Sequence, residues 1–200
     1  MSELYEFDKR YKRIVAGVDE AGRGPLAGPV VAAAAVIKKY DDRLESINDS
    51  KKLSEKKREE LYNVIMECFD VGVGIVDVGT IDKVNILNAT FKAMNSALTD
   101  LNEKYELVLV DGNKKIKEYN GEQEAVVKGD GKSLVIAAAS IVAKVTRDRL
   151  MMEMAKNYPL YMFEKHKGYG TKLHIEKIRE HGIVEEHRRS FVKKYWENNK

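Results

Sequence analysis

Cysteine is almost absent from this chain of 200 residues, because Cys68 is the only one. A single cysteine cannot form an intrachain disulfide, and the apolar neighbours Met66 and Phe69 predict that it lies in a core. This composition excludes the small secreted folds that depend on disulfides, and we expect the protein to work in a reducing cytoplasm.

Long hydrophobic runs are missing as well. The longest, residues 30–37, has the length of a strand and falls far short of the ~20 residues that span a bilayer. Residues 1–12 are charged and lack the apolar segment of a signal peptide. Three prolines, no repeat and no flexible linker predict one domain over residues 1–200, with no membrane attachment.

The chain also has little excess charge of either sign, since 35 basic and 32 acidic residues leave a net charge of only +3. The total therefore does not point to nucleic acid, but its distribution is uneven. Basic residues and histidines are dense from Lys165 to the end, as in His187-Arg188-Arg189. A basic C-terminal region opposite an acidic cluster is consistent with a polyanion held across a metal site. A solvated helical surface is the alternative.

Apolar strand patterns alternate with amphipathic helix patterns along the chain. Strands are expected over residues 14–18, 30–37, 71–76, 107–110 and 124–127. Helices are expected over 55–68 after Ser54, from Thr80 to about 101, over about 132–157, and over 171–181 before Gly182. This order predicts an α/β fold, a sheet covered by helices, with a purely helical part after Lys132.

Two adjacent acids, Asp19 and Glu20, end the first predicted strand, and Gly22, Arg23 and Gly24 follow at once. Buried carboxylates are costly without a cation. Glycine lets the backbone approach a ligand closely, and arginine suits phosphate geometry. The stretch therefore indicates a metal-dependent enzyme that acts on a phosphate ester.

Acids also follow two further predicted strands: Asp111 comes directly after residues 107–110, and Asp130 comes three residues after residues 124–127. Ligands bind beyond the carboxyl ends of parallel strands, so the four acids would converge there. Oxygen ligands without clustered histidine or cysteine suit Mg²⁺ or Mn²⁺, and two such ions would clamp both reacting oxygens of a phosphodiester. The alternative is that each acid only forms a turn or caps a helix.

Two polar loops add candidate substrate contacts. Lys51, in a loop before a helix, can reach a phosphate, and Tyr169, between glycines, can stack on a sugar or base. Packing is the alternative for Tyr169. Asp148, between two arginines, is interpreted as a surface ion-pair partner, and the histidines show no metal-ligand spacing.

The chain resembles bacterial ribonuclease HII over nearly its whole length. The matching segments are 17–30 with Asp19-Glu20-Ala21-Gly22-Arg23-Gly24-Pro25, 48–53 with Asn48-Asp49-Ser50-Lys51-Lys52-Leu53, 110–112, 128–130, 137–145, 147–148, 166–171 with His166-Lys167-Gly168-Tyr169-Gly170-Thr171, and 187–191. So many ordered motifs make a far more specific signal than any one of them.

The resemblance implies a ribonuclease H-like fold, a mixed five-stranded sheet with an antiparallel second strand. It implies an endonuclease that hydrolyses the RNA strand of RNA/DNA hybrids and cuts 5′ of ribonucleotides embedded in duplex DNA, leaving 3′-hydroxyl and 5′-phosphate ends. Such an enzyme would serve ribonucleotide excision in DNA replication and repair, and we expect a monomer.

By motif position, the family's metal-binding catalytic carboxylates correspond to Asp19, Glu20, Asp111 and Asp130. The resemblance assigns ribose 2′-hydroxyl sensing to the turn of Gly22, Arg23 and Gly24, and packing on the following deoxyribose to Tyr169. The chain would be the catalytic core alone, without the extra C-terminal helical segment of some members or the N-terminal domain of the related HIII class.

Two rival functions remain open from the sequence. A general nuclease or DNA-repair endonuclease would use the same carboxylates without needing the glycine turn. A non-catalytic nucleic-acid-binding module would need the basic end, but converging acids would repel its ligand.

Overall fold

The computed structural model describes residues 2–47 and 53–196. Its centre is a sheet of five strands in the order β3-β2-β1-β4-β5. The strands are β1 (Val15–Ala21), β2 (Val30–Ile37), β3 (Phe69–Val76), β4 (Leu107–Asp111) and β5 (Gln123–Val126). Because β2 runs antiparallel to β1 and β3 while β4 and β5 run parallel to β1, the sheet is mixed, as the resemblance implied.

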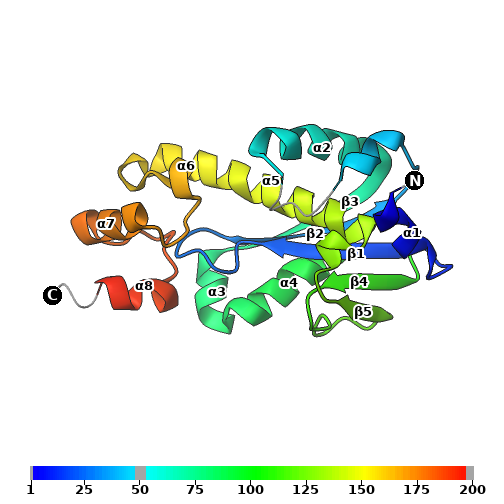
Figure 1. The fold of residues 1–200 in the computed structure, drawn as a ribbon. Helices are drawn as coiled ribbons and strands as arrows, with labels where there is room; N and C mark the ends of the chain where they lie inside the picture. Colours follow the sequence, from blue (N-terminus) through cyan, green and yellow to red (C-terminus); the bar gives the residue numbers. More distant parts are fainter. Residues whose placement is uncertain (1, 48–52, 197–200) are drawn as a thin grey trace.

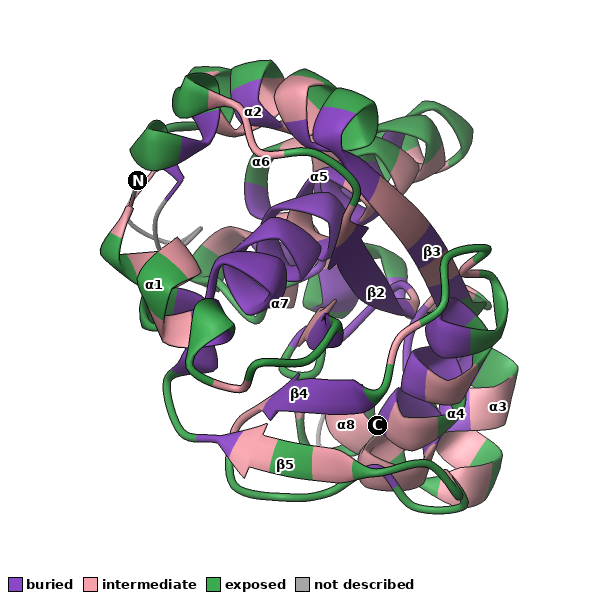
Figure 2. Cartoon of the chain, turned by 90° about the vertical axis from the view of Figure 1, so that its right-hand side faces the viewer, coloured by how far each residue is buried: buried purple, intermediate pink, exposed green. Residues whose placement is uncertain are grey.

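Helices cover both faces of the sheet (Figure 1). One face carries α1 (Glu3–Lys9), α2 (Glu55–Cys68) and the long α5 (Leu134–Asn157), and the other carries α3 (Val78–Val84) and α4 (Ile86–Thr99). Successive residues of β2 point to opposite faces, so Ala33 packs toward α5 and Ala34 toward α4. Cys68 is buried, as predicted. Figure 2 shows β4, which lies between β1 and β5, largely buried, and the edge strand β5 partly exposed.

The predicted elements match the structure closely, with one clear error. The single helix that we expected from Thr80 to about residue 101 is two helices. Asn85 has a φ of 66°, which interrupts the helical backbone between α3 and α4. Asp77 caps the first through the backbone N–H of Thr80, and Asn85 caps the second. Asparagine tolerates positive φ better than most residues, so it can end one helix and start the next.

The helical C-terminal part lies beyond one end of the sheet (Figure 1) and comprises α6 (Phe163–His166), α7 (Lys172–His181) and α8 (Arg189–Trp196). Short 3₁₀ turns occur at η1 (Asp42–Ser46), η3 (Gly129–Gly131) and η4 (Pro159–Tyr161). The segment after β1 joins this part to the sheet, since Leu26 N–H donates to Gly168 O and Leu26 O accepts from Arg188 N–H, both at 2.8 Å. None of the helices in the described ranges is both long and apolar enough to cross a bilayer.

Three histidines that are far apart in sequence meet inside this helical part. The His166 and His174 rings stack with centroids 4.3 Å apart, and His187 lies 5.2 Å from His174. Their sequence spacing gives no sign of this, and both ring nitrogens of His174 have hydrogen-bond partners.

Hydrogen-bond directions determine where the protons of two of these rings lie. Val184 N–H donates to His187 Nδ1 (3.0 Å), so the proton of a neutral His187 is on Nε2 and donates to His174 Nε2 (3.1 Å). The proton of His174 is then on Nδ1 and donates to Tyr169 O (2.9 Å). Both imidazoles are neutral here, and burial lowers the pKa of His174 and of His187 to about 4.

We expect the free energy of unfolding of the His187→Gln variant to fall less steeply than that of the wild type as the pH is lowered. Between pH 6.5 and 4 the unfolded chain protonates His187 while the native state does not, so the free energy of unfolding falls as the pH falls. Removing this group should recover roughly 3 kcal/mol of that loss. The pKa values of Asp8 and Asp19 are raised and act in the opposite sense, so the measurement is the difference between variant and wild-type denaturant curves across pH. The exposed His181→Gln is the control, and equal slopes for all three proteins would contradict the assignment.

Candidate functional site

The first two acids lie at the carboxyl end of β1. Asp19 is 5% exposed and accepts the backbone N–H of Glu20 at 2.7 Å. Its pKa is raised well above the usual range, chiefly by burial and then by the charges of Glu20 and Asp111. A hydrogen bond with Ser140 of α5 acts in the other direction. The three carboxylates are therefore close enough to repel one another.

Asp111 is the last residue of β4, the parallel neighbour of β1. The register pairs Val18 with Val110, so Asp19, near the end of β1, follows the same pair as Asp111, the last residue of β4. Asp111 Oδ1 accepts the backbone N–H of Gly129 at 2.7 Å, which draws η3 against the strand end. Asp130, the next residue after Gly129, is 6% exposed in this turn. Asp130 as a metal ligand stays a prediction.

A cavity of about 230 Å³ joins Asp19 and Glu20, but not Asp111 or Asp130, to the predicted substrate loops. The residues that line it are Asp19, Glu20, Ala21, Gly22, Arg23, Gly24, Ser140, Lys144 and Tyr169. Glu20 and Asp111 also line a smaller hollow of about 70 Å³ against α4. The structure thus brings together segments that lie up to 150 residues apart in sequence, which were linked before only by motif.

Two of the lining residues, Ser140 and Lys144, were not predicted from the sequence as site residues. With Asp148 they form a stripe at four-residue spacing along α5, whose residues 134–145 are otherwise apolar, and this polar stripe was the available signal. Lys144 Nζ contacts Asp148 Oδ1 at 2.7 Å and lies 6.0 Å from the centre of the Tyr169 ring. Asp148 does form an ion pair, but with Lys144 and in a buried position (8% exposed), so its interpretation as a surface residue was wrong.

Each of the two predicted substrate loops exposes a side chain that lines the cavity. Arg23 is paired with Glu20 at 3.2 Å, and its side chain is 52% exposed. Tyr169 is 41% exposed on the loop between α6 and α7, as expected for a ring that contacts a ligand. Lys51, the remaining predicted substrate contact, lies outside the described residues.

The carboxylates have the right chemistry to bind a hard divalent cation, although they are not arranged as a complete coordination site. In the described ranges, no three acidic, histidine or cysteine side chains are grouped closely enough to hold a metal. Glu20 turns toward Arg23 and Asp111 toward Gly129 N–H, which separates charges that repel. All the donors are carboxylate oxygens, the ligands preferred by Mg²⁺ and Mn²⁺. A cation would relieve the repulsion that raises the pKa of Asp19.

Divalent metal should accordingly raise the thermal midpoint. Binding to the native state alone adds about 2.7 kcal/mol at one hundred times the dissociation constant, or roughly 5–10 °C for a chain of this size. Midpoints would be compared in chelator, in excess Mg²⁺ and in excess Mn²⁺. An Asp19→Asn variant is the control and should lose most of the shift. An unchanged wild-type midpoint would count against a clustered site.

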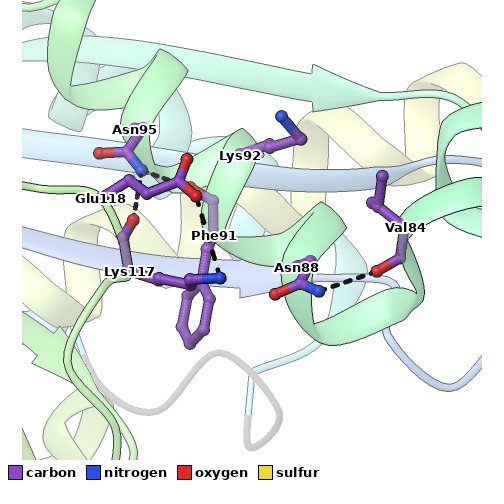
Figure 3. A pocket seen from close by; sticks show the side chains of 7 residues that line it. All are labelled: Val84, Asn88, Phe91, Lys92, Asn95, Lys117 and Glu118. Carbon is purple, nitrogen blue, oxygen red and sulfur yellow. Dashed lines mark hydrogen bonds and ion pairs between the residues drawn. The ribbon is translucent and has the colours of Figure 1, made fainter.

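A separate pocket of about 190 Å³ lies on α4 and contains none of the predicted site residues (Figure 3). Its two amide side chains hold the local backbone, since Asn88 Nδ2 donates to Val84 O at 3.0 Å and Asn95 Nδ2 donates to Lys117 O at 2.9 Å. This pocket therefore reflects how α4 is joined to the loop after β4.

Comparison with known proteins gives one consistent result. The family model described as Ribonuclease HII matches residues 16–199. A ribonuclease HII of Fusobacterium nucleatum is 64% identical over 199 residues, covering 97% of this chain and 92% of its own. The crystal structure of ribonuclease H2 from Pyrococcus horikoshii superposes with a TM-score of 0.78 at 31% identity, covering 92% of this chain and 98% of its own.

A crystal structure of a ribonuclease HIII in complex with Mn²⁺ shares the fold alone, with a TM-score of 0.77 at 20% identity over 94% of this chain and 70% of its own. The predicted ribonuclease H-like fold is thus confirmed. The sheet, the strand-end acids and these relatives agree, and the chain belongs to the ribonuclease HII family of metal-dependent endoribonucleases.

Proposed function

We propose that this protein hydrolyses the RNA strand of RNA/DNA hybrids and cuts 5′ of single ribonucleotides embedded in duplex DNA. The products would carry 3′-hydroxyl and 5′-phosphate ends, and the enzyme would act as a monomer. The observation that supports this most is the single cavity in which Asp19, the glycine turn and Tyr169 all take part.

The acids would hold the catalytic ions in this scheme. Asp19, Glu20, Asp111 and Asp130 would supply oxygen ligands, with Asp19 and Asp111 on neighbouring parallel strands. When bound, two divalent ions lower the pKa of the attacking water and stabilise the leaving oxygen. Arg23 and Lys144 add positive charge at the edge of the cavity, where the phosphates of the cut strand would pass.

Selectivity would come from the neutral parts of the cavity. Only the ribose 2′-hydroxyl distinguishes RNA from DNA at a given position. Backbone groups of residues 22–24 can contact this hydroxyl directly, because Arg23 and Gly24 are exposed at the cavity wall. The ring of Tyr169, on the opposite loop, would pack on the next sugar.

The test uses matched duplexes that carry a ribo, deoxyribo or 2′-O-methyl unit at one position. We expect metal-dependent cleavage of the ribo duplex alone, on its 5′ side, with the stated ends identified by mapping the products. Cleavage of the all-DNA duplex at a comparable rate would instead favour the general nuclease.

Tyr169→Ala should weaken activity on the embedded ribonucleotide without weakening metal binding. Loss of a stacking contact costs on the order of 1–3 kcal/mol, which corresponds to a loss of roughly 5- to 150-fold in kcat/KM. Tyr169→Phe keeps the ring and should retain most of the activity. The measurements are kcat/KM on the single-ribonucleotide duplex and the Mn²⁺-induced rise in midpoint. Equal rates for the alanine variant and the wild type would remove Tyr169 from the substrate site.

A further inference from the structure

Two arginines are fully buried and form no ion pair with an acid in the part of the chain that the structure describes. Arg147 of α5 is 1% exposed and Arg188, just before α8, is 0% exposed. Among the described residues, neither lies within 4 Å of a carboxylate oxygen, and all their recorded hydrogen bonds go to backbone carbonyls. Buried charges usually reduce stability compared with apolar side chains of the same size, so this arrangement calls for another reason.

Arg188 holds the proposed ribose-sensing turn from below. Its Nη1 donates to Arg23 O at 3.0 Å, and its Nη2 donates to Gly22 O at 2.6 Å. Gly28 O accepts from Nη2 at 2.7 Å and from Nε at 2.9 Å. A planar guanidinium with five donors can bind three carbonyls at fixed angles, which a lysine ammonium cannot do.

These bonds also decide where two backbone N–H groups point. In a planar trans peptide the C=O and the N–H point in opposite directions. Because the carbonyls of Gly22 and Arg23 point inward to Arg188, the N–H groups of Arg23 and Gly24 point outward. Neither N–H has an acceptor in the described part of the protein, and both residues line the catalytic cavity. The buried guanidinium of Arg188 thus orients two backbone N–H donors toward the same wall of the cavity.

Arg147 connects this turn to the loop that carries Tyr169. Its Nε donates to Pro29 O at 3.0 Å and its Nη2 to Ala27 O at 3.1 Å, in the segment that follows the turn. Its Nη1 donates to Lys167 O at 2.9 Å, two residues before Tyr169, and its guanidinium carbon lies 5.8 Å from the centre of the Tyr169 ring. The same side chain therefore sets the spacing between the two substrate loops.

We propose that Arg188 and Arg147 are positioning residues for substrate selectivity: Arg188 turns the backbone N–H groups of Arg23 and Gly24 toward the ribose 2′-hydroxyl, and Arg147 fixes the distance from this turn to Tyr169. This inference rests on the proposed function and adds the residues that prepare its selectivity. Both side chains act through other groups and do not contact the substrate.

The first test is Arg188→Lys, which keeps the charge but not the three-carbonyl geometry. We expect kcat/KM on the single-ribonucleotide duplex to fall by at least about tenfold, since small errors in position are costly in catalysis. The rise in midpoint with Mn²⁺ should stay as in the wild type, because the acids are untouched. Arg149→Lys, on the exposed side of α5 and paired with Glu59, is the matched control and should keep both values. A folded Arg188→Lys with wild-type kcat/KM would overturn the proposal.

A second measurement covers the case in which Arg188→Lys does not fold. Amide resonances of wild-type Arg23 and Gly24 would be followed by NMR while a ribo or a matched deoxy duplex is added in Ca²⁺, under conditions without turnover. We expect both amides to shift with the ribo duplex and much less with the deoxy duplex. Equal responses to the two duplexes, in an enzyme that still cuts only the ribo form, would contradict the positioning role. If the wild type does not discriminate between the duplexes, the proposed function itself fails.

Discussion

Asp111→Asn should abolish turnover and at the same time raise the thermal midpoint of the metal-free protein. Asparagine keeps the shape of the side chain and its oxygen can still accept Gly129 N–H. It removes one of the charges that repel the buried Asp19, so the apo protein should gain a few degrees. It also removes an anionic metal ligand, and we expect kcat to fall by at least about a thousandfold.

The control for this substitution is Asp42→Asn, an exposed acid at the start of η1 that lies outside the cavity. It should keep the wild-type rate and midpoint. The measurements are steady-state cleavage in saturating metal and calorimetry in chelator. An active Asp111→Asn enzyme would exclude this residue from the site. A lower apo midpoint would show that the contact with Gly129 needs the full carboxylate charge.

Gly22→Ala should destabilise the fold, whereas Gly24→Ala should reduce activity without unfolding it. Gly22 has a φ of +95°, and a Cβ there would lie 2.1 Å from Arg147 Nε and 2.8 Å from Pro29 O. We expect a loss on the order of 3 kcal/mol, or roughly 6–12 °C in midpoint. A Cβ on Gly24 would meet only Tyr169 Cε1, at 4.0 Å. It would project into the substrate cavity and cost about tenfold in kcat/KM.

The family motif alone suggested that glycine at position 22 lets the backbone approach a ribose, so that alanine would be tolerated by the fold. The structure corrects this, because the space in front of Gly22 is filled by the protein's own arginine. Thermal melts and cleavage assays on the two alanine variants separate the roles. Equal midpoints for both variants would contradict the packing argument for Gly22. Full activity of Gly24→Ala would show that its side of the turn does not face substrate.

The strands, the acids at their ends and most helix boundaries could be predicted from the sequence. Local patterns carry this information. Runs of β-branched residues favour strands. Ser54 and Thr171 each cap a helix, because their side chains accept the backbone N–H of the residue three positions later. The helix-like spacing of apolar residues continues across α3 and α4, although the backbone leaves the helical conformation at Asn85. Periodicity reports which side of a helix is buried, and it does not report a single residue of unusual φ.

The sequence by itself therefore determined the fold class, the family and the positions of Asp19, Glu20 and Asp111 near strand ends, because each depends on short segments whose chemistry is local. Only the tertiary structure decided which side chains surround those acids. Lys144 reaches the cavity from α5, and Arg147 and Arg188 are buried against carbonyls of the segment after β1. The partners of the two arginines are backbone oxygens up to 166 residues away, and a backbone carbonyl has the same chemistry in every residue. No pattern of side chains can mark it in advance.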